Sequence, residues 1–140
     1  MVEKVVRGVF STTLSLDCEP GSAQGSCSDV RSTVGISGAW TGSISIELPR
    51  SLAVVIAAKM FNVASEVVSE ADLLDAVSEV ANQVAGGVKS NFPSSCSLEV
   101  PRTESLVPGE DAASSAIATQ YVFKIENTAF IVVLSLMSAA

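Results

Sequence analysis

The sequence predicts an α+β fold in which helices pack on one face of an antiparallel or mixed β-sheet. Apolar residues recur at helical spacing in residues 2–16, 51–61 and 69–91, whereas they alternate with other residues along 42–48. The predicted order is helix, two strands, two helices and then strands, which favours a sheet with its helices on one side. The chain has 140 residues, so we expect residues 1–140 to form a single domain.

The first elements follow from periodicity and from breaker residues. Residues Val2 to Leu16 are predicted to form an amphipathic helix, and the stretch that begins at Pro20 is predicted to be a surface loop. A strand from Val30 to Ile36 then forms a hairpin with a second strand that ends at Leu48. We expect Trp40, at this turn, to pack against the end of the sheet rather than to form a binding platform.

Two helices follow the hairpin. Pro49 ends the strand, and Ser51 is placed to cap a mostly buried helix that reaches Phe61. The next helix, from about Ser69 to Asn91, is the longest periodic segment in the chain, and Pro93 stops it.

The rest of the chain is predicted to be mostly strand. Short strands are expected near Cys96 to Val100 and from Ile117 to Met137, with a turn at Glu126-Asn127, and the polar stretch from Arg102 to Ser115 is expected to be a loop. The run from Phe130 to Leu134 is apolar on both strand faces. That strand is therefore either central in the sheet or covered on its outer face by another subunit.

Composition excludes several classes of function. The net charge of -7 disfavours nucleic-acid binding, and the absence of histidine removes the usual general base, zinc ligand and Ser-His-Asp triad, so we expect no metal site. The three cysteines form no C-x-x-C pair, and we expect reduced thiols, although a Cys18–Cys27 disulfide stays open. We find no secretion signal and no apolar stretch of roughly 18 residues, and expect a cytoplasmic protein that does not bind membranes.

The long helix carries the most informative pattern. At about 100° per residue, Asp75, Glu79, Asn82 and Gly86 fall within an arc of roughly 60°. The opposite side is apolar and must face the sheet, so Glu79 and Asn82 are predicted to point to solvent. An ordinary solvated face would explain this periodicity. Three features favour instead a surface left bare for another protein: an asparagine in the middle of the helix, the Gly86-Gly87 pair, and an exposed stripe almost free of lysine. Gly87 is expected to serve the packing of the helix on the sheet.

The string Asp75-x-x-x-Glu79-x-x-Asn82-x-x-x-Gly86 resembles the signature helix of the CheC/CheX/FliY phosphatases of bacterial chemotaxis. The single-domain CheX branch is the most similar. The resemblance extends to the glycine-containing hairpin at residues 35–42, the strand end at residues 48–49 and the segment 19–21 after the first helix, so it covers most of the chain. It implies a CheC-like fold.

The resemblance also implies a function. The substrate would be a phosphorylated CheY-type response-regulator receiver, which brings its own Mg²⁺, so the chain would need no cofactor. Asn82 would orient the attacking water, Glu79 would pair with the receiver's phosphate-site lysine, and Asp75 and Gly86 would support docking. The first helix has Val6 where a second asparagine would be needed, so one centre per chain is expected. The family further implies a homodimer formed by strand pairing.

Two alternatives to a phosphatase stay open. The chain is a non-catalytic module if the same helix only binds a receiver or a flagellar-switch component. It is a regulatory domain that shares the fold alone if Glu79 and Asn82 are idle. Other chemistry has little support, because no P-loop is present and Cys96 lies in a predicted strand.

Overall fold

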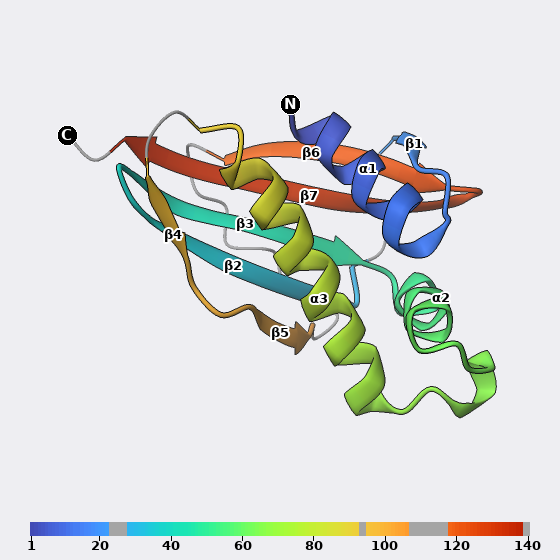
Figure 1. The fold of residues 1–140 in the computed structure, drawn as a ribbon. Coiled ribbons are helices and arrows are strands. Elements are labelled where there is room, and N and C mark those ends of the chain that lie inside the picture. The colour runs from blue at the N-terminus through green and yellow to red at the C-terminus, as the bar shows by residue number, and fades with distance from the viewer. Residues whose placement is uncertain (23–27, 93–94, 107–117, 139–140) are drawn as a thin grey trace.

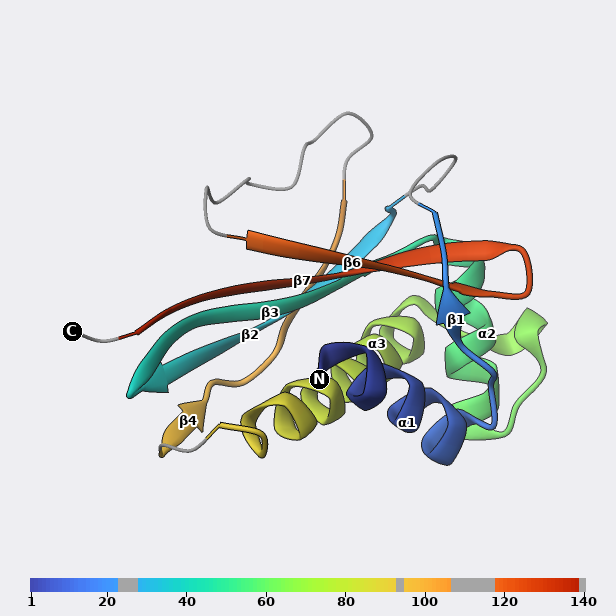
Figure 2. The same ribbon diagram turned by 90° about the horizontal axis from the view of Figure 1, so that it is seen from above.

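The computed structural model describes residues 1–22, 28–92, 95–106 and 118–138. Seven strands form one sheet in the order β1-β6-β7-β3-β2-β4, with β5 also paired to β2, and every pair is antiparallel. The helices lie together on one face of this sheet (Figures 1 and 2), as the sequence predicts. The elements are α1 (Val2–Leu14), β1 (Glu19–Pro20), β2 (Val30–Gly38), β3 (Trp40–Leu48), α2 (Arg50–Phe61), the 3-10 turn η1 (Ser65–Val67), α3 (Glu70–Lys89), β4 (Cys96–Leu98), β5 (Arg102–Ser105), β6 (Ala118–Ile125) and β7 (Thr128–Ser138).

The predicted hairpin is the β2–β3 pair. Its register runs from Val30 opposite Leu48 to Ile36 opposite Gly42, so alternate apolar side chains of both strands face the helices. Trp40 stacks on Phe92, with ring centroids 6.0 Å apart, which confirms that it packs at the end of the sheet.

Strand β7 lies between β6 and β3 and pairs with both along most of its length. The strand is therefore central in the sheet, which is the first of the two possibilities for the run from Phe130 to Leu134, although the helices cover only the face that carries Phe130 and Val132. The stacked rings of Phe10, Phe123 and Phe130 join α1 to the sheet beside it, with centroids 4.9 Å and 5.4 Å apart. The inner face of β7 is therefore buried by α1 within one chain.

The predicted cap of α2 is wrong. The helix begins at Arg50 after Pro49, and no side-chain cap is formed, so Ser51 already lies inside the helix. The backbone N–H of Arg50 instead donates to Oδ2 of Asp29, at 2.9 Å. A carboxylate from the loop before β2 therefore satisfies one of the free N–H groups at the start of α2.

Two short strands fall where loops were predicted. Glu19–Pro20 pairs with β6, and Arg102–Ser105 pairs with β2, while residues 23–27 and 107–117 of the two predicted loops lie outside the described residues. Strand β5 is held by side chains as well as backbone. Oγ1 of Thr103 donates to Oγ of the fully buried Ser32 at 2.8 Å, and Arg31 pairs with Glu104 at 3.1 Å.

Helix α3 begins where the sequence places it and ends two residues early, at Lys89. Ser69 and Asp72 form a reciprocal capping box: the Asp72 N–H donates to Oγ of Ser69 at 3.1 Å, and the carboxylate accepts from the Ser69 N–H at 3.4 Å. Pro93 lies outside the described residues. Within the described part of the chain, no helix is both long and apolar enough to cross a membrane.

Candidate functional site

The outer face of α3 exposes the polar residues that the sequence singled out. The side chains of Asp75, Glu79 and Asn82 are exposed, and Gly86 is half-buried. The opposite side forms a continuous buried face against the sheet and neighbouring helices, made of Leu73, Ala76, Val77, Val80, Ala81, Val84, Ala85 and Val88. Because that face fixes the rotation of the helix, it also fixes the outward direction of the carboxylates and the amide.

Glu79 and Asn82 lie almost one turn apart, about 4.5 Å along the axis of α3. Such a separation lets one visiting surface contact both side chains. Among the described residues, neither Asp75 nor Asn82 uses its side chain in a hydrogen bond or ion pair. The Asn82 amide can therefore both donate to and accept from an external molecule.

Glu79 has a neighbour that the sequence analysis did not identify. Nε2 of Gln83, one turn further along α3, donates to Oε1 of Glu79 at 3.1 Å. Oε1 of Gln83 in turn accepts from Oγ1 of Thr13 on α1, at 2.6 Å. The spacing of Glu79 and Gln83 is a signal for this contact, but the part of Thr13 is not visible in the sequence, because Thr13 and Gln83 are 70 positions apart.

The two glycines of α3 have different surroundings. A Cβ at Gly86 would meet nothing within 4 Å, whereas a Cβ at Gly87 would lie 2.5 Å from Cγ1 of Val5. The predicted role of Gly87 in helix-on-sheet packing is therefore wrong, because its close contact is with α1. Beside Gly86 a hollow of about 510 Å³ opens, with Lys89 and Phe92 among its lining residues.

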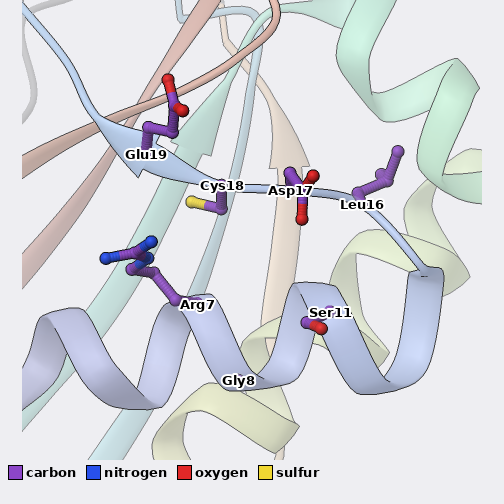
Figure 3. A pocket seen from close by; sticks show the side chains of 7 residues that line it. All are labelled: Arg7, Gly8, Ser11, Leu16, Asp17, Cys18 and Glu19. Carbon is purple, nitrogen blue, oxygen red and sulfur yellow. The ribbon is translucent and has the colours of Figure 1, made fainter.

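A separate cleft of about 490 Å³ lies between α1 and the chain that leads into β1. In Figure 3, Arg7 extends from α1 toward Cys18 and Glu19 on the opposite wall. Burial raises the pKa of the Cys18 thiol to about 12, which leaves it almost wholly protonated near neutral pH. Cys18 and Cys96 are free thiols, whereas Cys27 lies outside the described residues. The thiol in this cleft is therefore a poor nucleophile.

Helix α1 does not repeat the pattern of α3. Glu3 is exposed but pairs with Arg7 at 3.6 Å, and the residue three positions after it, Val6, is fully buried in the core. Helix α1 therefore has no side-chain amide three residues after Glu3, whereas α3 has Asn82 three residues after Glu79. Within residues 1–22, 28–92, 95–106 and 118–138, no group of three or more acidic or cysteine side chains is placed to hold a metal ion.

The described part of the chain has the fold of CheC-like proteins, an antiparallel sheet with helices packed on one face. Residues 30–125 match the family model described as chemotaxis phosphatase CheX. The chain belongs to the CheX family. Comparison with curated proteins gives no match.

Solved structures share this fold over nearly the whole chain. CheX from Vibrio vulnificus is 22% identical with a TM-score of 0.78, and the alignment covers 97% of this chain and 93% of that one. CheX from Desulfovibrio desulfuricans is 21% identical with a TM-score of 0.78, covering 98% and 95%. The CheX of a CheX–CheY–BeF3–Mg²⁺ complex from Borrelia burgdorferi is 17% identical with a TM-score of 0.76, covering 98% and 96%.

Proposed function

We propose that this protein hydrolyses the aspartyl phosphate of a CheY-type receiver. The observation that carries the proposal is the exposed Glu79–Asn82 pair on a helix whose rotation is fixed by its buried face. Membership of a family of chemotaxis phosphatases supports it, as does the complex of the Borrelia burgdorferi CheX with CheY, BeF3 and Mg²⁺.

The chemistry needs little from this chain. Water attacks the phosphorus in line with the bond to the receiver's aspartate, that bond breaks, and the aspartate carboxylate and inorganic phosphate are released. The proton lost by the water is taken up by a phosphoryl oxygen. Because the receiver's Mg²⁺ would neutralise charge on the phosphoryl group, the main requirement is to place the water, which is the role of Asn82.

Glu79 has a different role in this proposal. Its carboxylate would pair with the receiver's phosphate-site lysine and fix the orientation of docking. Asp75 and the open backbone at Gly86 lie on the same face, where they would extend the contact toward both ends of the helix. No metal or cofactor of this chain takes part, since the ion belongs to the substrate.

The test is phosphate release from a phosphorylated receiver with and without the protein. We expect Asn82→Ala to reduce the acceleration by about 100-fold while the fold persists, because a misplaced water costs roughly that factor. Asn91→Ala is the control, since Asn91 is an exposed asparagine just beyond the same helix whose amide donates to the Gly87 carbonyl at 2.8 Å instead of being free for a partner. Acceleration that survives both Asn82→Ala and Glu79→Ala contradicts the mechanism.

The second candidate is a module that uses the same face only to bind a receiver or a flagellar-switch component. The exposure of Glu79 and Asn82 suits this role equally, because binding needs the same free surface. Binding of the phosphorylated receiver without faster phosphate release would favour it. The homodimer that the family resemblance implies stays a prediction, and the outer face of β7, which the helices of the described chain do not cover, is where a second subunit would pack. Light scattering on the purified protein measures its mass directly.

A further inference from the structure

A hydrogen-bonded chain of side chains connects α1 to the proposed docking carboxylate on α3. Oγ1 of Thr13 donates to Oε1 of Gln83 at 2.6 Å, and Nε2 of Gln83 donates to Oε1 of Glu79 at 3.1 Å. These two hydrogen bonds connect α1 and α3, which pack beside each other over the sheet (Figure 1).

The chemistry of the two ends fixes the amide of Gln83 in one orientation. A carboxylate at the ordinary pH of the cell only accepts hydrogen bonds, so the amide must turn its NH₂ group toward Glu79. Its oxygen then faces α1, where the Thr13 hydroxyl is able to donate. If Thr13 could not donate, the amide would keep only its hydrogen bond to Glu79, and the Gln83 side chain would be less restricted.

Holding Glu79 matters because an exposed glutamate samples many rotamers. A partner that binds such a side chain must first restrict it, and that loss of freedom weakens binding. The Gln83 amide donates to Oε1 of Glu79, while among the described residues none forms a hydrogen bond or ion pair with Oε2. One carboxylate oxygen is thus presented to the outside in a restricted position.

We propose that Thr13 and Gln83 are positioning residues that orient Glu79 for the positively charged group of the docking protein. The inference rests on the proposed function, because it assigns Glu79 a cationic partner. It makes α1 a contributor to a site whose contact residues lie on α3. Since neither residue touches the water or the phosphorus, their loss should weaken docking and leave the chemical step intact.

The experiment measures KM and kcat of receiver dephosphorylation for matched variants. Thr13→Val and Gln83→Leu keep the approximate shape of each side chain and remove its hydrogen bond. We expect either to raise KM about two- to fivefold with kcat unchanged, as befits one surface hydrogen bond and the ordering of one side chain. Thr13→Ser retains the hydroxyl and should restore the KM. Thr12→Val is the control, because Thr12 is the exposed neighbour on α1 without such a contact.

A double-variant measurement separates positioning from a general loss of structure. If Thr13 acts through Glu79, Thr13→Val should have no further effect on KM in a Glu79→Ala background, whereas a merely structural effect would persist there. Equal KM values for wild type, Thr13→Val and Gln83→Leu overturn the inference, as does an effect of Thr13→Val that is unchanged by Glu79→Ala. The proposed function fails separately, if wild-type protein does not accelerate phosphate release at all.

Discussion

Replacing each glycine of α3 by alanine separates the stability of the helix from the access that docking needs. Gly86 lies in the last turns of the helix, and a Cβ there would meet nothing within 4 Å. Alanine should therefore stabilise the fold by about 0.5–1 kcal/mol through its higher helix propensity. For a domain of this size, the midpoint of thermal unfolding should rise by roughly 2–4 °C.

Gly87→Ala should have the opposite effect. Its Cβ would lie 2.5 Å from Cγ1 of Val5, a β-branched side chain with little freedom to move away. Overpacking of this kind costs about 1–3 kcal/mol, which offsets or exceeds the gain in propensity. Gly86→Ala should therefore raise the melting temperature, whereas Gly87→Ala should leave it unchanged or lower it.

Gly86→Ala should weaken binding of the receiver even though it stabilises the fold. A methyl group added at the proposed docking face should raise the KM for the phosphorylated receiver by about tenfold, since it must be accommodated in a close contact. Thermal unfolding by circular dichroism and a phosphate-release assay provide the two measurements. A more stable Gly86→Ala protein with wild-type KM would refute the idea that the receiver approaches the backbone there. A destabilised Gly86→Ala protein would refute the open surroundings of that residue.

Three further predictions address the cap, the buried thiol and the docking charge. Ser69→Ala removes one half of the capping box with Asp72 and should cost about 1 kcal/mol in urea unfolding; an unchanged midpoint would mean that the cap is not formed in solution. The test of the thiol uses a protein in which the other cysteines are replaced by serine. Because burial raises the pKa of Cys18 from 9.0 to about 12, the folded protein should have about a thousandfold less Cys18 thiolate at pH 8 than the unfolded chain. Cys18 should therefore react slowly with a thiol reagent until the protein unfolds. Equal labelling rates in both states would contradict this. Glu79→Gln should raise the KM for the receiver about tenfold and weaken the dependence of KM on salt. The control Glu66→Gln, on η1, should change neither. An unaltered salt dependence in Glu79→Gln would exclude a charge pair at Glu79.

Helices and strands whose apolar residues recur at regular spacing were predictable from the sequence. The apolar face of α3 fixes its rotation, so the outward direction of Glu79 and Asn82 follows from spacing alone. The β2–β3 hairpin follows in the same way from alternation in its second strand.

Elements defined by distant partners were not predictable. Strand β5 is polar and mostly exposed, and it forms because β2 offers a free edge and a buried hydroxyl at Ser32. The start of α2 depends on Asp29, which lies 21 positions before Arg50. The contact from Thr13 to Gln83 has the same origin, since only the packing of α1 beside α3 brings these two residues together.

The most direct test of the central claim is a single-turnover measurement. A small amount of phosphorylated receiver is mixed with a saturating excess of this protein, so that binding is complete and the observed rate reports phosphoryl loss alone. We predict rapid loss with the wild-type protein and a rate close to that of the receiver alone with Asn82→Ala, although both proteins bind the receiver. Equal rates for wild type and Asn82→Ala under saturation would contradict the assignment of the water to Asn82.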